Sequence, residues 1–212
     1  MAPANRLVLH TDSAWISPYV FSCFVALHEK ELPYETASVS LEGGEQHLPG
    51  FRDRALTGRV PALQHGDFWL AESSAIVEYL DEAFPDRPRM LPGDVRERAR
   101  ARQIMAWIRS DLLALREERP TTTMFYERAT KPLSSAGEEA AAKLLRVADL
   151  VIPEGKTSLF DAFSIADADL AFMLHRLILN DHEVPAKARA FAEAQWDRAS
   201  IKAFVVRERT PA

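Results

Sequence analysis

Apolar and polar positions along the first part of the chain predict strands and helices in turn. Residues 6–11, RLVLHT, predict a strand, and residues 18–30 predict a helix that begins at a Ser-Pro pair. Pro33 separates that helix from a second predicted strand, YETASVSL, at residues 34–41. This order predicts a βαβ unit at the start of the chain.

The following segment predicts a hairpin and another helix. A loop at residues 42–59, EGGEQHLPGFRDRALTGR, leads to two short strands, VPALQ and FWLAE, on either side of a His-Gly-Asp turn. A helix is predicted at residues 73–84, SSAIVEYLDEAF, because Ile76, Val77 and Leu80 fall at helical spacing. The βαβ unit and this ββα segment together predict one α/β domain at residues 1–86.

The rest of the chain has a helical pattern, which begins after the linker PDRPRMLPGD. A long helix is predicted at residues 94–118, with one apolar stripe formed by Ala101, Ile104, Ile108, Leu112 and Leu115. Further helices are predicted at about residues 135–151, 164–179, 185–196 and 200–208. Ser164, with Asp167 three residues later, predicts a capping box. The predicted fold class is therefore α/β plus all-α, with an all-helical domain at residues 87–212.

Charge and composition narrow the classes of partner. The 212 residues carry a net charge of −5, and arginines are interleaved with acids, so a nucleic-acid partner is not favoured. No charged N-terminal region precedes a long apolar run, and no apolar stretch would span a bilayer, so we expect no membrane partner and a cytoplasmic location.

The single cysteine closes no disulfide within the chain, and metal-site spacings of Cys and His are absent. His175 and His182 are expected on the surface.

The Ser-Pro-Tyr-Val sequence at residues 17–20 lies close to Cys23, the only cysteine of the chain. Either Cys23 is the working thiol, or Ser17 holds a thiol that arrives with a ligand. Ser17 is suited to cap the helix, because its oxygen can accept a backbone N–H and Pro18 loses no hydrogen bond at the first helical position. A helix start also favours an anion such as a thiolate. A serine hydroxyl that donates to a thiolate contributes about 1.5 to 3 kcal/mol. That energy lowers the pKa of the thiol by about one to two units.

Cys23 is the other candidate sulfur. It would lie past the orphan N–H groups of the helix start, among Phe21, Phe24 and Val25. Most such cysteines are small core residues. The sequence therefore favours a structural Cys23 and a thiol that arrives with a ligand, and a glutaredoxin-like nucleophilic Cys23 is the less favoured interpretation.

Several stretches resemble the glutathione S-transferases. SPYV stands where thioredoxin-like and glutaredoxin-like proteins carry Cys-Pro-Tyr-Cys, and SPYVFSCFVALHEKELPYE resembles the first helix and second strand of a glutathione transferase. GRVPALQHGDFWLAESSAIVEYL resembles the glutathione-binding block, and FSIADADLAFML resembles the capped helix of the second domain. RARARQIMAWIRSDLLALREERPT is similar to a bacterial branch, the YfcF type. The resemblance implies the glutathione transferase fold, with a thioredoxin-like first domain.

The resemblance also implies roles for residues of the first domain. Ser17 corresponds to the serine that stabilises the glutathione thiolate. The implied glutathione-binding residues are His47, Arg59, Val60, Glu72 and Ser73. Val60, before a proline that is cis in the family, contacts the cysteinyl part, and Glu72 with Ser73 holds the γ-glutamyl end. His47 is the first choice for the glycine carboxylate, because the loop lacks a lysine at the expected place.

The second substrate is expected on the helical domain. Trp107, Ser110 and Asp111 share a mixed polar and aromatic face of the predicted long helix and are the candidates. In the alternative interpretation, Trp107 is a core residue and the polar residues meet solvent or a subunit partner. Met124, Phe125 and Tyr126 form a second candidate wall.

The implied activity is that of a glutathione transferase, with glutathione as co-substrate and no metal. One activated thiolate can attack a small electrophile, a peroxide or a disulfide, so the sequence does not choose among these reactions. The family is commonly dimeric, and a homodimer is expected. The alternative is a non-catalytic interaction module in transcription or translation, since a fold does not by itself define a function. The joint presence of Ser17, Pro61, Glu72 and Ser73 argues against that alternative.

Overall fold

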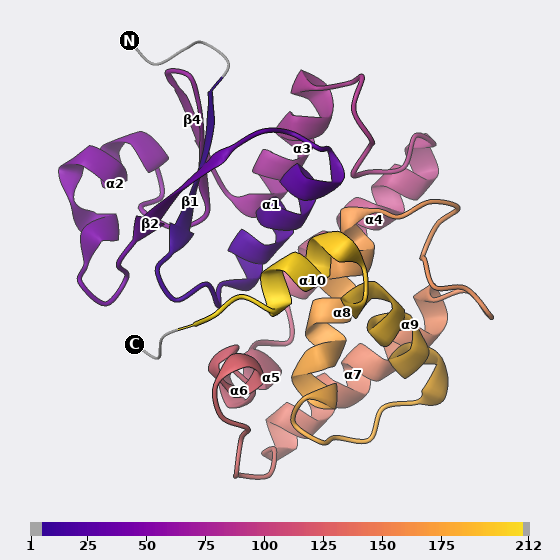
Figure 1. The fold of residues 1–212 in the computed structure, drawn as a ribbon. Helices are drawn as coiled ribbons and strands as arrows, with labels where there is room; N and C mark the ends of the chain where they lie inside the picture. Colours follow the sequence, from indigo (N-terminus) through magenta and orange to yellow (C-terminus); the bar gives the residue numbers. More distant parts are fainter. Residues whose placement is uncertain (1–5, 210–212) are drawn as a thin grey trace. The chain divides into compact units, whose positions relative to one another are not determined.

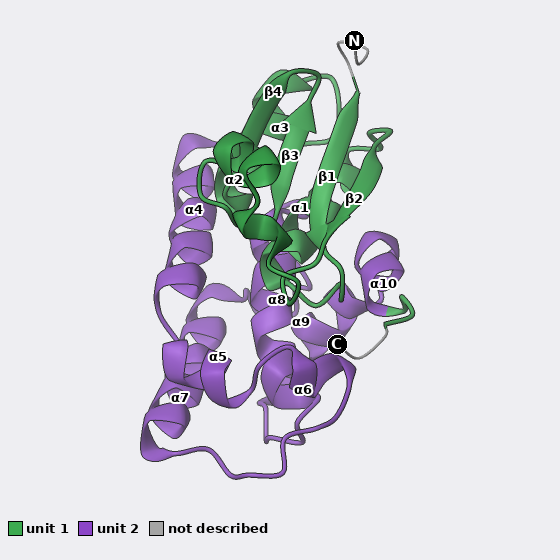
Figure 2. Cartoon of the chain, turned by 90° about the vertical axis from the view of Figure 1, so that its left-hand side faces the viewer, with its two compact units in different colours: residues 1–90, 206–212 green, residues 91–205 purple. Residues whose placement is uncertain are grey.

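The computed structural model describes residues 6–209 and divides into two compact units (Figure 2). Unit 1 contains the described residues 6–90 and 206–209, and unit 2 contains residues 91–205. The expected boundary after residue 86 lies close to this division. Residues 206–209, which were expected in the helical domain, cluster with unit 1. Within the described part of the chain, no helix has the length and apolar character needed to cross a membrane.

Unit 1 is built on a four-stranded mixed sheet (Figure 1). Its main elements are β1 (Leu7–Asp12), α1 (Pro18–Glu29), β2 (Glu35–Val39), β3 (Ala62–His65), β4 (Phe68–Ala71) and α3 (Ser73–Ala83). The strand order is β2-β1-β3-β4; β1 pairs with β2 in parallel, whereas β3 is antiparallel to both β1 and β4. This arrangement confirms the predicted thioredoxin-like βαβ-ββα domain.

The core of unit 1 lies between the sheet and the helices α1 and α3. All residues of α1 from Val20 to Leu27 are buried, and α3 buries Ile76, Val77 and Leu80. Leu9 and Leu63, which are register partners on β1 and β3, are almost inaccessible to solvent. Burial of this apolar area is the main force that holds both helices against the sheet.

The expectation of a loop at residues 42–59 was wrong in part. The segment contains the 3-10 turn η1 (Glu45–His47) and the helix α2 (Pro49–Ala55). The ring of Phe51, on α2, packs edge-on against Trp69 of β4 at 6.2 Å and against His10 of β1 at 5.6 Å. These contacts are distant in sequence, so a local pattern does not reveal them.

Unit 2 consists of helices throughout its regular structure (Figure 1). They are α4 (Val95–Ser110), α5 (Leu113–Glu118), α6 (Thr122–Phe125), α7 (Ser135–Val151), α8 (Ile165–Ile178), α9 (Ala186–Trp196) and α10 (Ala199–Val205). All residues of α8 from Ile165 to Leu177 are buried, and α4, α7 and α9 pack around it. The predicted capping box is confirmed, because Ser164 Oγ accepts from Ala166 N and Asp167 Oδ2 accepts from Ser164 N.

The prediction of one helix at residues 94–118 was wrong. The chain leaves the helix after Ser110, and Leu112 adopts φ +60° before α5 begins. The carboxylate of Asp111 accepts hydrogen bonds from Leu112 N at 2.7 Å and from Trp107 Nε1 at 3.0 Å. Aspartate side chains that bond to nearby backbone compete with the helical pattern in this way. The helix α6 was also not predicted.

His175 is buried, contrary to the expectation of a surface position. Its ring stacks on Trp196 with centroids 3.7 Å apart, and Nδ1 lies 2.9 Å from the carbonyl oxygen of Ala171. Because burial disfavours the imidazolium, the pKa of His175 is lowered to about 4. The prediction failed because α8 is enclosed on all sides and has no solvent-facing stripe.

Candidate functional site

The strand register brings three segments of unit 1 to one end of the sheet. His10, near the end of β1, is the register partner of Ala62, which begins β3, and Ala62 is also the partner of Ala71, which ends β4. The residues that follow β1, precede β3 and follow β4 therefore meet at the same end. These are the segments that carry Ser17, Val60 and the Glu72-Ser73 pair.

Ser17 is the N-cap of α1, as predicted. Its Oγ accepts from Val20 N at 3.3 Å, a long distance for this kind of hydrogen bond. The carboxylate of Asp12 accepts from Ile16 N at 2.7 Å and from Ser17 N at 3.3 Å, and burial raises the pKa of Asp12. A hydroxyl has one donor besides its lone pairs, so Ser17 can accept from the helix while donating its hydrogen to a ligand.

The backbone at the other two segments has unusual geometry. The Val60–Pro61 peptide bond is cis, which confirms the conformation implied by the resemblance. Glu72 has φ +69° although it is not glycine, a conformation that costs energy and that clusters at ligand sites. Ser73 is the first residue of α3 and is buried, whereas the Glu72 side chain is exposed and makes no capping bond. The backbone N–H groups at this helix start suit a carboxylate.

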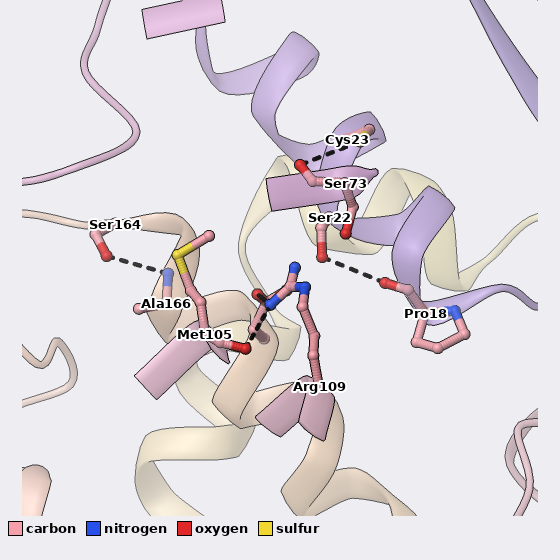
Figure 3. Close-up of polar contacts among 9 residues, drawn as sticks. Pro18, Ser22, Cys23, Ser73, Met105, Arg109, Ser164 and Ala166 are labelled. Carbon is pink, nitrogen blue, oxygen red and sulfur yellow. Dashed lines mark hydrogen bonds and ion pairs between the residues drawn. The ribbon is translucent and has the colours of Figure 1, made fainter. Parts of the chain in front are cut away.

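Cys23 is buried, in agreement with the structural role that the sequence favoured. The side chain has no exposed surface, and its Sγ donates to the carbonyl oxygen of Ser73 at 3.8 Å (Figure 3). This contact joins α1 to the start of α3, next to the candidate site. A thiol without exposed surface does not meet an external disulfide or electrophile, so the position disfavours a nucleophilic Cys23.

The candidate cations for the glycine carboxylate implied by the resemblance lie on the segment between β2 and β3. His47 ends η1 in an exposed position, with its Nε2 3.2 Å from Gln46 Nε2. Arg59 directly precedes Val60, is exposed, and makes no hydrogen bond or ion pair within residues 6–209 that would occupy its guanidinium. The neighbouring Arg52 pairs with Asp53, and Arg54 lies over the Trp69 ring. Of the three arginines of this segment, Arg59 is therefore the one whose guanidinium makes no hydrogen bond, ion pair or ring contact within residues 6–209.

One of the three second-substrate candidates of unit 2, Trp107, lines a cavity. Trp107 is half-buried and lines a cavity of about 630 Å³, whereas the walls of that cavity include neither Ser110 nor Asp111. Asp111 accepts from Trp107 Nε1 and pairs with Lys143, whose ammonium lowers the pKa of the Asp111 carboxyl. The cavity is lined by Arg100, Gln103, Ile104, Trp107, Lys143, Arg146, Val147, Leu150, Val151, Leu159 and Phe160.

Sequence reasoning missed the contribution of α7 to this cavity. Lys143, Arg146, Val147 and Leu150 all come from α7, a helix predicted with its correct bounds but without a function. The amphipathic pattern of α7 was the only signal in the sequence that pointed to an exposed face of this helix. Which neighbouring elements form a cavity with that face is decided by the tertiary structure. Across the described residues 6–209, no group of three or more His, Cys, Asp or Glu side chains could hold a metal ion.

Two family models match the chain almost from end to end. The model described as glutathione S-transferase, N-terminal domain, matches residues 16–83, and the model described as glutathione S-transferase, C-terminal domain, matches residues 94–209. Glutathione S-transferase Z1 of Arabidopsis thaliana is 31% identical, over 90% of this chain and 89% of its own. A glutathione transferase homologue from Burkholderia GL BGR1, solved with bound glutathione, has a TM-score of 0.77 and 38% identity, covering 95% of this chain and 96% of its own.

Another relative matches over a shorter stretch. The probable maleylacetoacetate isomerase 2 of Drosophila melanogaster is 41% identical over 49% of this chain and 46% of its own length. The first curated relatives that the chain matches are each covered over less than half of their length.

Proposed function

Because the chain belongs to the glutathione S-transferase family, we propose that it binds glutathione in unit 1 and activates the glutathione thiol for attack on an electrophile. The observation that carries this proposal is the meeting of Ser17, the Val60-Pro61 pair and the Glu72-Ser73 pair at one end of the sheet. The finer assignment to the YfcF-type branch stays a prediction.

Each part of glutathione has a chemical counterpart at this end of the sheet. The Ser17 hydroxyl donates to the thiolate, and the Val60 backbone pairs with the cysteinyl part. The Glu72 carboxylate faces the γ-glutamyl ammonium, while the hydroxyl and N–H groups of Ser73 face the γ-glutamyl carboxylate. Arg59 or His47 holds the glycine carboxylate. No metal takes part in this scheme.

The activated thiolate is the only nucleophile that the scheme needs. It adds to a carbon electrophile to form a thioether, and the same thiolate can reduce a peroxide or a disulfide by attacking oxygen or sulfur. Transfer to a carbon electrophile is the main proposal, and the two reductions are secondary activities of the same site. A non-catalytic interaction module is the competing function, and it requires that glutathione binding has been lost.

The proposal is tested by the pKa of the bound thiol. In a Cys23→Ala protein, the thiolate absorbance of bound glutathione is followed against pH, with and without Ser17→Ala. We expect Ser17→Ala to raise that pKa by about one to two units, because it removes one charge-assisted hydrogen bond. Activity at a pH below the pKa should fall about 10- to 100-fold with the thiolate fraction.

A matched control uses another serine of the same connection. Ser13 is exposed between β1 and α1, and Ser13→Ala should leave the thiol pKa unchanged. If glutathione binds with the pKa of free glutathione in every variant, the Ser17 mechanism is wrong. If glutathione does not bind at all, the interaction module becomes the better hypothesis.

We place the second substrate in the cavity lined by Trp107. Its walls are largely apolar, and three cations, Arg100, Lys143 and Arg146, lie among them. Lys143 pairs with Asp111, and Arg100 donates to Gln103, but Arg146 makes no ion pair or hydrogen bond within residues 6–209. The combination suits an electrophile with an apolar body and a carboxylate. The name of the Drosophila relative, an isomerase of the acid maleylacetoacetate, agrees with this chemistry.

Replacing Trp107 separates the two substrates. We expect Trp107→Ala to raise the KM for a carboxylate-bearing electrophile about tenfold, through lost contact area, without changing the dissociation constant of glutathione. Leu113→Ala, at an exposed position outside the cavity, is the control. An unchanged KM in Trp107→Ala would show that the second substrate binds elsewhere.

A further inference from the structure

The last described residues of the chain return to unit 1. After α10 ends at Val205, residues 206–209 belong to the same compact unit as the sheet (Figure 2). We call residues 206–209 the C-terminal tail. Its two arginines, Arg207 and Arg209, both contact Trp15, which lies two residues before Ser17. The tail therefore contacts the connection that carries the proposed thiolate-stabilising serine.

Arg207 lies in a group of four rings. Its guanidinium carbon is 3.8 Å from the centroid of the Trp15 ring and 5.1 Å from that of Phe24. Phe24 in turn contacts His28 at 4.2 Å and Tyr34 at 6.3 Å. A guanidinium on the face of a tryptophan is held by both cation–π attraction and planar stacking. Arg207 thus links the tail to Trp15 and to the buried side of α1.

Arg209 holds the backbone of the same residue. Its Nε donates to the carbonyl oxygen of Trp15 at 2.9 Å, a contact across 194 positions of sequence. This carbonyl belongs to the peptide unit that leads into Ile16, whose N–H is held by Asp12. The peptide before Ile16 is thereby held through its oxygen by Arg209 and through its N–H by Asp12.

The connection between β1 and α1 needs such support. Trp15 adopts φ +54°, a left-handed conformation that is costly for a bulky side chain. Within the connection, Trp15 N donates to the Asp12 carbonyl at 3.2 Å. A conformation of this kind persists only where surrounding contacts hold it, and the tail supplies contacts to both the ring and the carbonyl of Trp15.

We propose that Arg207 and Arg209 are positioning residues, which hold the Trp15 connection so that the Ser17 hydroxyl points at the glutathione thiol. This inference rests on the proposed function of Ser17. Neither arginine donates to the thiol in this scheme; both act through Trp15. The tail is thus a distant part of the chain that completes the geometry of the thiol site.

The test uses the full chain in the Cys23→Ala background and combines two sets of substitutions. Arg207→Ala with Arg209→Ala is introduced alone and together with Ser17→Ala, and the pKa of the bound glutathione thiol is measured in each protein. We expect the double arginine variant to raise the pKa by about half as much as Ser17→Ala does. In the presence of Ser17→Ala, the arginine substitutions should add no further shift, because they act through Ser17.

Two further variants separate positioning from other causes. Arg207→Lys with Arg209→Lys keeps both charges but loses the planar stacking and the Nε donor. Positioning predicts a thiol pKa close to that of the alanine variant, whereas full restoration of the wild-type pKa would show a charge effect and overturn the proposal. Arg198→Ala removes an arginine that stacks on Phe163 at 3.9 Å in unit 2 and should leave the thiol pKa unchanged.

The possible failures are distinguishable. If Ser17→Ala itself does not shift the pKa, the proposed function of Ser17 fails, and the inference about the tail falls with it. If Ser17→Ala shifts the pKa but the arginine variants bind glutathione with the wild-type pKa, only the inference about the tail is wrong. The inference about the tail is also overturned if the pKa shift caused by the arginine substitutions adds fully to the shift caused by Ser17→Ala. The lysine variants, which retain both charges, provide the same tests should the alanine variant fold poorly.

Discussion

Replacing Arg109 with methionine is expected to lower the free energy of unfolding of unit 2 by about 3 to 5 kcal/mol. Arg109 Nη1 donates to Asp169 Oδ2 at 2.7 Å. It also donates to the carbonyl oxygen of Met105 at 3.0 Å (Figure 3). The Asp169 side chain is only 5% exposed and that of Arg109 is 17% exposed, so the pair that joins α4 to α8 is largely removed from water. Without Arg109, the Asp169 carboxylate stays buried and loses this charge-assisted hydrogen bond.

A compensating substitution tests that reason. Arg109→Met together with Asp169→Leu removes both charges, and we expect it to recover most of the lost stability, since apolar residues of similar volume often replace a buried pair. Arg128→Ala breaks the pair with Asp181, whose side chains are 64% and 69% exposed, and should change stability by less than about 1 kcal/mol. Denaturation is best followed by hydrogen exchange of the α8 amides, because a chain with two units need not unfold in one step. Equal losses in Arg109→Met and Arg128→Ala would contradict the argument.

The second large effect concerns two groups on α8 with opposite dependence on pH. Burial raises the pKa of Asp167 from 3.8 to about 6, so the stability it contributes is fully present below pH 3.8 and is lost as the pH rises through 6. Burial lowers the pKa of His175 from 6.5 to about 4, so its contribution is present above pH 6.5 and is lost as the pH falls through 4. Each shift corresponds to about 3 kcal/mol. We therefore expect the two effects to cancel almost completely between pH 4 and 6.

Single substitutions should reveal how Asp167 and His175 each change the free energy of unfolding with pH. With Asp167→Asn, only the histidine effect remains, and the free energy of unfolding should rise by about 3 kcal/mol relative to wild type from pH 4 to pH 6.5. With His175→Phe, which keeps an aromatic ring against Trp196, the free energy of unfolding should fall by about 3 kcal/mol relative to wild type over the same pH range. Asp161→Asn, at an exposed position in the connection before α8, should leave the pH dependence of the free energy of unfolding as it is in wild type. Parallel profiles for all variants would show that neither buried group titrates between the folded and unfolded states.

Most helices and strands were predictable because their signals are local. Ser17 caps α1 through Val20, and Ser164 and Asp167 cap α8, by contacts between residues that are neighbours in sequence. The bounds predicted for residues 135–151 match α7 because its apolar stripe repeats at helical spacing. The resemblance, rather than the pattern, supplied the roles proposed for Val60 and Glu72.

The failures depend on contacts that no local pattern encodes. The helix α2 is held by Phe51 against Trp69, and the long helical pattern is interrupted where Asp111 bonds to its own neighbours. His175 is buried because three helices enclose α8. The cavity beside Trp107 exists only because α7 supplies its other wall.

The sequence by itself determined the α/β plus all-α class, the cap at Ser17 and the buried character of Cys23, because side-chain size, spacing and capping chemistry act over a few residues. Only the tertiary structure decided which of these segments meet. Strand register brings Ser17, Val60 and Ser73 to one end of the sheet, and the C-terminal tail reaches Trp15 from 194 positions away. Such contacts form when apolar burial repays the entropy of closing long loops, and that balance belongs to the whole fold rather than to any one segment.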